Sequence, residues 1–275
     1  MIASIVRLAL AWIAMLVAQI AVGTIIHLNN PPPPHAFLWL MVSNAFTVLP
    51  VGAAALRSDW RGWRLLSALF FIPGAAATVN LIEGAVYLPN VGLDWRGLII
   101  LELLSLAVAA LLWLIIFRGA PLVEPSAGSP LPHRSLAQKL ARFALCSACY
   151  VFLYFLAGTI IFPFVRDFYA TQHIPTFGRI VSLQFFLRGP VFILVCLTLL
   201  RMFRLPHLPG ALGVGLAFTS VSAVANLIMP NGIFPDPVRW AHFCEVTSSN
   251  FVFGFVVGWL WGHARRVSNL APAAA

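Results

Sequence analysis

The sequence has few charged residues. Asp, Glu, Lys and Arg make up only 9% of its 275 residues, and hydrophobic residues make up 61%. Ordinary soluble domains carry roughly 25% charged residues, so this composition excludes a water-soluble globular protein. The mean hydropathy of +0.93 indicates an integral membrane protein instead.

Acidic residues and cysteines are also scarce. Eight acidic residues stand against 17 basic ones, which gives a net charge of +9. The basic residues are scattered between apolar runs rather than gathered on a polar face, so no nucleic-acid partner is expected. The four cysteines lie inside apolar segments and indicate no disulfide framework. Phosphate-binding loops, metalloprotease helices and nucleophile elbows are absent from the sequence, so no metal or cofactor is expected.

Long apolar runs dominate the chain instead. A helix needs about 20 apolar residues to cross a roughly 30 Å hydrocarbon core. Eight runs meet this condition, and they cover residues 4–27, 36–56, 65–88, 97–117, 143–165, 180–203, 210–229 and 240–262. Within the first run, Arg7 precedes an apolar stretch that could be a cleaved signal peptide, although it is long for that role. The predicted fold is an all-α membrane protein with about eight transmembrane helices.

The positions of Arg and Lys predict the orientation of these helices, because positive charge is retained on the cytoplasmic side. Alternate loops hold most of the basic residues, and the remaining loops are short and rich in proline. The basic loops carry Arg7, Arg57, Arg61, Arg64, Arg118, Arg134, Lys139, Arg142, Arg201, Arg204, Arg265 and Arg266. Both termini are therefore predicted to be cytoplasmic, and the compact loops favour a bacterial inner membrane.

The two halves of the sequence resemble each other. Residues 21–26 (AVGTII) resemble residues 156–161 (LAGTII), and Asn80-Leu-Ile matches Asn226-Leu-Ile. We expect a first four-helix repeat over 1–118, a Pro-, Ser- and Gly-rich linker over 119–140, and a second repeat over 141–275. Because each half holds an even number of spans, the repeats should be parallel, as in some transporters. Chance similarity between apolar helices is the alternative.

A spaced polar pattern is the most specific sign of this duplication. Arg96, Glu102 and Ser105 in the fourth span have the same separations as Arg239, Glu245 and Ser248 in the eighth. Other polar residues lie at similar depth in the non-cytoplasmic halves of their spans, where helical spacing gathers them into stripes. The candidate binding residues are Glu83, Glu102, Glu245, Arg188, Asn80, Asn226, His242, Asn44, Gln184, Ser105 and Ser248. Together they predict a polar cavity open to the non-cytoplasmic side.

The candidate carboxylates outnumber the candidate guanidinium groups. Glu83, Glu102 and Glu245 accompany only Arg188 within the bilayer depth. Unpaired buried carboxylates either take up a proton or bind a cation, and ionisable groups inside membranes are functional candidates by default. Two simpler interpretations remain open. Glu102 and Glu245 could pair with Arg96 and Arg239 as structural contacts, and Arg188 could pair with a helix carboxylate rather than an anionic ligand.

Three functions fit these observations. The leading hypothesis is a small solute or ion transporter, with the lipid bilayer, a small solute, a cation or a proton as partners. The second is a membrane-embedded enzyme acting on a lipid or lipid-linked substrate, with Glu245 or His242 as general base. The third is a structural or assembly subunit. In addition, Gly254, Gly258 and Gly262 recur every fourth residue, which allows close helix packing within the chain or in a homo-oligomer.

Overall fold

The computed structural model describes residues 2–26, 35–89, 91–120, 134–172, 174–231 and 233–262. Every regular element in these ranges is helical, and eight helices are long and apolar enough to cross a membrane. The first four are α1 (Ile2–Ile25), α2 (Ala36–Arg57), α3 (Gly62–Tyr87) and α4 (Trp95–Phe117). The protein is therefore a multi-pass membrane protein, and the predicted helical class is confirmed.

Two of the remaining four spans are continuous helices and two contain a π-helical turn. The continuous ones are α5 (Leu136–Tyr169) and α10 (Asp236–Trp261). One interrupted span consists of α6 (Phe177–Leu183), the π-helical turn η1 (Gln184–Arg188) and α7 (Gly189–Phe203), and the other consists of α8 (His207–Thr219), η2 (Ser220–Val224) and α9 (Ala225–Leu227). Most of the predicted linker, residues 121–133, lies outside the described residues, and α5 already begins at Leu136.

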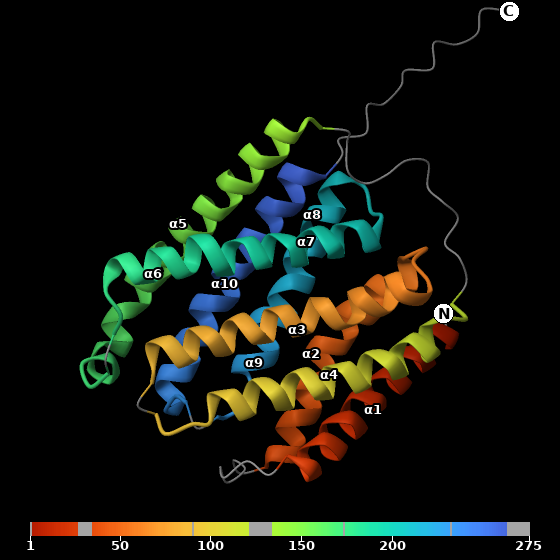
Figure 1. The fold of residues 1–275 in the computed structure, drawn as a ribbon, viewed down its shortest axis with the longest axis horizontal. Coiled ribbons are helices and arrows are strands. Elements are labelled where there is room, and N and C mark those ends of the chain that lie inside the picture. Colours follow the sequence, from red (N-terminus) through yellow and green to blue (C-terminus); the bar gives the residue numbers. More distant parts are fainter. Residues whose placement is uncertain are drawn as a thin grey trace, which may run out of the picture.

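The spans pack in a regular pattern. Helix α4 packs against both α1 and α3, and α10 packs against both α5 and α8. The two groups meet where α2 and α3 contact α7, η2 and α9. In Figure 1, α1 to α4 (red to yellow) lie on one side of the bundle, and α5 to α8 (green to cyan) lie on the other. Large apolar side chains such as Leu10, Phe152 and Leu216 are exposed, as expected of faces that contact lipid.

The glycine ridge of α10 is used inside the chain. A Cβ on Gly254 would lie 3.0 Å from the Cα of Gly215, and one on Gly258 would lie 2.7 Å from the Cα of Ala211. Both contacts are with α8. A Cβ on Gly262 would lie 2.8 Å from the His207 ring. The close packing within the chain, one of the two alternatives for this ridge, is therefore found against α8, and the homo-oligomer stays a prediction.

The π-helical turn η1 has a local cause. Pro190 lacks a backbone N–H and its ring crowds the preceding turn, which disrupts the regular helical hydrogen bonds. The N–H of Gly189 accordingly bonds to the carbonyl of Gln184, five residues back, and the N–H of Ala225 bonds to the carbonyl of Ser220 in the same way. Such turns occur frequently at functional sites. Both face the polar residues described next.

Candidate functional site

An ion pair between α3 and η1 lies at the centre of the polar residues. Arg188 contacts the Glu83 carboxylate through its Nη1 atom, and the two side chains are only 4% and 18% exposed. Arg188 also donates from Nη2 to the Asn80 side-chain oxygen at 2.8 Å, and from Nη1 to Gln184 Oε1 at 3.4 Å. The sequence predicted each of these residues as a site residue, and the structure brings all four together.

Gln184 bonds to Glu83 and Tyr87 as well as to Arg188. Gln184 donates from Nε2 to Glu83 Oε1 at 2.7 Å and to the Tyr87 hydroxyl oxygen at 2.9 Å. Glu83 and Tyr87 lie one turn apart on α3, and Gln184 and Arg188 lie at the two ends of η1. Five side chains from two elements therefore share one network, which we call the Arg188 cluster (Asn80, Glu83, Tyr87, Gln184 and Arg188).

Burying this ion pair is costly. Taking two charges out of water costs several kcal/mol per ion (order of magnitude), and good geometry with additional hydrogen bonds is needed to offset it. The Arg188 cluster supplies such bonds from Asn80 and Gln184. However, the Nε atom of Arg188 is buried and has no hydrogen-bond partner among the described residues. One donor of the guanidinium therefore stays available to another acceptor.

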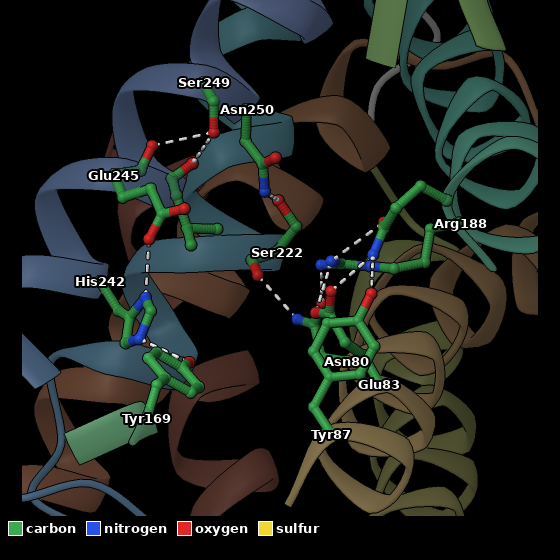
Figure 2. A network of polar contacts seen from close by, with 12 residues as sticks. Asn80, Glu83, Tyr87, Tyr169, Arg188, Ser222, His242, Glu245, Ser249 and Asn250 are labelled. Atoms are coloured by element: carbon green, nitrogen blue, oxygen red, sulfur yellow. Dashed lines mark hydrogen bonds and ion pairs between the residues drawn. The ribbon is translucent and has the colours of Figure 1, made fainter. Parts of the chain in front are cut away.

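Hydrogen bonds connect the Arg188 cluster to the second interrupted span and to α10. Asn80 donates from Nδ2 to the carbonyl of Ser222 at 2.8 Å, and Asn250 donates from Nδ2 to the Ser222 hydroxyl at 2.9 Å. Ser222 lies in η2 and is buried. Figure 2 shows Ser222 between the Arg188 cluster on one side and α10 on the other.

A second group of polar side chains lies on α10 and at the end of α5. His242 Nδ1 lies 2.7 Å from Glu245 Oε2, and His242 Nε2 lies 2.9 Å from the Tyr169 hydroxyl oxygen. The side chains of His242 and Glu245 are 13% and 11% exposed. Figure 2 shows these residues in one line from carboxylate to imidazole to phenol, which we call the His242 chain.

Gly158 makes room for the carboxylate of the His242 chain. A Cβ at Gly158 on α5 would lie 3.4 Å from Glu245 Oε1. This distance is at the short limit of ordinary van der Waals contact, so α5 lies directly beside the Glu245 carboxylate. Phe234 also covers the His242 ring, with ring centroids 4.9 Å apart. The imidazole and its carboxylate are therefore enclosed by helix backbone and aromatic rings.

Tyrosines were missed as site residues in the sequence. The chain has only four, Tyr87, Tyr150, Tyr154 and Tyr169, and all of them lie at these two groups. The guanidinium carbon of Arg188 lies 5.7 Å from the centre of the Tyr150 ring. Tyr154 faces Tyr87. Tyr150, Tyr154 and Gly158 are spaced by four residues and so share one face of α5, a signal that was available in the sequence.

The structure does not bring all the candidate residues together. Glu102 is partly exposed and has no hydrogen bond or ion pair with any described residue. Asn44 is buried and donates to Gln19 at 2.5 Å. Asn226 is exposed and donates to its own helix at the carbonyl of Val221. Neither Asn residue contacts the Arg188 cluster.

The two serines of the duplicated pattern also lie apart from the clusters. Ser105 is buried, and its hydroxyl has no partner among the described residues. Ser248 is exposed and donates to the carbonyls of Cys244 and Glu245 in its own helix. The role of both serines in binding stays a prediction.

No protein-family model, curated protein or solved structure matches this chain. The chemistry of the site therefore has to be inferred from its own geometry. In the described ranges, no group of three or more His, Cys, Asp and Glu side chains is arranged to hold a metal ion. The two groups of side chains instead offer a paired guanidinium with one unused donor and an enclosed imidazole.

Proposed function

We propose that the protein is a small solute transporter whose two four-helix halves move relative to each other. The observation that carries this proposal is the buried Glu83–Arg188 pair, which joins α3 to η1 where the two groups of helices meet. Ionisable groups inside a membrane are costly and are retained for function by default. A charged contact placed at a boundary between moving parts fits a transport site better than it fits a rigid scaffold.

The helix packing supports the duplication on which this proposal rests. In the first half, α4 packs against α1 and α3, and α1 packs against α2. In the second half the corresponding spans repeat these contacts, since α10 packs against α5 and α8, and α5 packs against η1 and α7. Pro50 in α2 and Pro190 in α7 add a match between the second and sixth spans, each six residues after an amide side chain, Asn44 or Gln184.

Arg188 is the residue we propose to bind the solute. Its Nε atom has no partner in the described chain, and its planar fork suits a carboxylate or phosphate. An anionic solute that replaces Glu83 on Arg188 would remove the ion pair between α3 and η1 without leaving the guanidinium unpaired, and only neutral hydrogen-bonding groups such as Asn80 and Tyr87 would then still hold the two elements together. Binding of the solute would then change the free-energy difference between two arrangements of the halves, as alternating access requires.

A second ion pair supports closure at the opposite end. Arg204 Nη1, just after α7, lies 3.3 Å from Asp59 Oδ2, just before α3. Asp59 and Glu83 lie at opposite ends of α3. Each end of the boundary between the halves is therefore held by one charged contact in this conformation. We propose that transport opens these contacts in turn.

The test measures movement and uptake in the purified full-length protein. Spin labels at Asp94 and Thr171 would report the distance between the halves at one end, and labels at Arg118 and Arg201 would report it at the other, in a background lacking the native cysteines. We expect two distances at each end, with opposite changes on adding solute. A single unchanged distance at both ends would contradict transport and favour a structural subunit.

Uptake into proteoliposomes tests the role of Arg188, with R96Q as the matched control. A panel of small carboxylates, phosphates and amino acids is offered to the native protein, to R188Q and to R96Q. Arg96 is exposed and has no described partner, so R96Q should transport normally. R188Q should lose uptake by at least about tenfold, which corresponds to about 1.4 kcal/mol. Equal uptake by R188Q and R96Q would remove Arg188 from the binding site.

A further inference from the structure

The His242 chain lies wholly within the second group of helices, apart from the ion pair between the halves. Tyr169 is the last residue of α5, and His242 and Glu245 lie near the start of α10. We propose that Tyr169, His242 and Glu245 form a proton-binding site that supplies the coupling ion of the transporter. This inference rests on the proposed function for its coupling role, whereas proton binding itself can be tested separately.

The hydrogen bonds of the His242 chain suit both protonation states of the ring. In the neutral ring, Nδ1–H donates to the Glu245 carboxylate, and Nε2 accepts from the Tyr169 hydroxyl. When a proton binds, Nε2–H donates to the Tyr169 oxygen, and the hydroxyl hydrogen rotates to another acceptor. Only one O–H bond has to turn, so no heavy atom needs to move. Histidine is also the side chain whose ordinary titration range includes physiological pH.

The enclosure of the site favours a proton over a metal or hydrated cation. Both ring nitrogens already have partners, and no third His, Cys, Asp or Glu among the described residues joins the group. Phe234 lies against the ring face, and Phe168 packs against Phe234 with centroids 5.8 Å apart. A dehydrated metal ion would find too few ligands here, and a hydrated one would have to displace the aromatic rings.

Tyr169 is the expected entry point for the proton. It lies at the end of its helix, and the neighbouring residues Ala170 and Thr171 are exposed. Its hydroxyl contacts the imidazole directly, so it can exchange a proton with water at the helix end and with Nε2 inside. At the other end, Glu245 Oε1 lies beside Gly158 of α5, and its side chain is 11% exposed.

The charged side chains beside the His242 chain on α10 and α5 are paired with each other. Glu245 is therefore the charged group that responds to a proton on His242. On α10 itself, Arg239 pairs with Asp236 at 2.9 Å. On α5, Arg166 and Asp167 pair with each other in the exposed last turn. From neighbouring elements, Glu83 and Tyr87 of α3 also act on Tyr169, and Tyr150 of α5 faces Glu245. A proton on His242 thus changes the net charge of the His242–Glu245 pair from negative to neutral.

Protonation of His242 would affect the Glu83–Arg188 ion pair. Asn250, five residues after Glu245, donates to Ser222, and the Ser222 carbonyl accepts from Asn80, which bonds to Arg188. The contacts run continuously from α10 through η2 to α3 (Figure 2). Only the backbone of α10 links Asn250 to Glu245, so a change of charge at Glu245 and His242 would act on this contact through a shift of α10. This arrangement would couple proton uptake to solute exchange.

The test observes the imidazole directly. The full-length protein, labelled with 15N-histidine and held in lipid nanodiscs, is examined by NMR between roughly pH 5 and pH 9, the range of histidine titration. The signal missing in H242Q identifies the ring. We expect it to change from neutral to doubly protonated within this range. A ring that keeps one protonation state throughout would overturn the proposal.

Two further variants and one control keep the test decisive if H242Q does not fold. Y169F removes a single hydroxyl and should change the Nε2 signal at constant pH while leaving Nδ1 nearly unchanged. E245Q removes the carboxylate that faces Nδ1 and should change the Nδ1 signal at constant pH. E102Q, at the same position in the other half, should leave the ring unchanged. An equal effect of E102Q and E245Q would contradict the assignment.

Failure of the transport proposal would look different. If no solute enters proteoliposomes but the ring titrates as described, the proton site stands and the proposed function fails. If solute uptake depends on Arg188 but His242 never titrates, the proposed function stands and the proton site fails. Uptake that responds to an imposed pH gradient in the native protein and loses this response in Y169F would support both.

Discussion

Helices α4 and α10 carry the same spaced polar pattern but place it in different surroundings. In α10, Arg239 is buried and Glu245 contacts His242. In α4, Arg96 is exposed and Glu102 has no described partner. The position three residues before the glutamate is His242 in α10 and Ile99 in α4. A repeated pattern is therefore insufficient to make a site, because partners from neighbouring positions and helices decide whether a buried charge is stabilised.

The largest expected effect breaks the ion pair that joins the two halves. Glu83→Gln leaves the Arg188 guanidinium buried without its counter-charge, which should destabilise the protein by about 3–5 kcal/mol. Glu102→Gln removes no described contact and replaces an unpaired carboxylate in a membrane span by a neutral amide, so it should not destabilise the protein. Unfolding of each variant in mixed detergent, followed by circular dichroism, measures the difference.

A double variant distinguishes the loss of charge balance from the loss of the hydrogen bonds around Arg188. Combining Glu83→Gln with Arg188→Met removes both charges and should recover part of the stability lost in the single variant. If the double variant is less stable than Glu83→Gln alone, the hydrogen bonds of Asn80 and Gln184 to Arg188 contribute more than the charge balance does.

The next effect compares the two arginines of the duplicated pattern. Arg239 donates to the carbonyls of Leu227 and Ile228 at 2.9 and 3.0 Å, where α9 ends. Hydrogen bonds from a charged donor contribute about 1.5–3 kcal/mol, so Arg239→Gln should destabilise the protein by about 2 kcal/mol. Arg96→Gln should change the unfolding free energy by less than about 0.5 kcal/mol. If both variants lose the same unfolding free energy in this assay, the burial of Arg239 does not contribute to stability.

Glycines are a further difference between α10 and α4. Helix α10 has Gly254 and Gly258 where α4 has Leu111 and Ile115. Gly258→Ala places a methyl group 2.7 Å from the backbone of Ala211, and this overpacking should cost about 1–3 kcal/mol. Gly23→Ala in α1 meets no atom within 4 Å and should stabilise its helix by about 0.5–1 kcal/mol. The two substitutions are chemically identical, so opposite signs in thermal unfolding would assign the cost to close packing of α8 and α10.

The number of helices was predictable from hydropathy, and the errors in their predicted ends have a local cause. Eight spans were expected, and eight are found among the residues that the structure describes. The fifth was predicted over 143–165 but runs from Leu136 to Tyr169. Lys139, Arg142 and Arg166 lie in its outer turns, so the apolar signal ends before the helix does. Hydropathy detects the part of a helix inside the hydrocarbon core, whereas the helix itself continues into the polar boundary.

The candidate site was predictable only in part, because contacts between distant helices do not follow from periodicity. Glu83 and Gln184 were predicted on separate stripes, and nothing in the sequence showed that they bond to each other. Asn226 matches Asn80 in its local sequence but is exposed. The π-helical turn η2 directly precedes it, and an added residue rotates the following positions by roughly 100°. A single-residue change in helical register therefore separates two equivalent asparagines.

The smallest expected effect concerns the corresponding turns before the third and seventh spans, which carry Asp59 and Arg204. Their ion pair is partly exposed, with 40% of the Asp59 side chain and 15% of the Arg204 side chain accessible. Exposed pairs contribute about 0.2–1 kcal/mol, so Asp59→Asn should destabilise the protein only within this range, and less at high salt.

The same substitution should have a larger effect on movement than on stability. If Asp59–Arg204 holds one end of the boundary between the halves closed, Asp59→Asn should shift the distance between labels at Arg118 and Arg201 toward the longer value, while the labels at Asp94 and Thr171 report the opposite change. A contribution of about 1 kcal/mol alters a two-state population about fivefold, which this measurement resolves although an unfolding curve barely does. Unchanged distances with lower stability would make the pair a surface contact, and the closure of that end would then rest on apolar packing between α2, α3 and α7 alone.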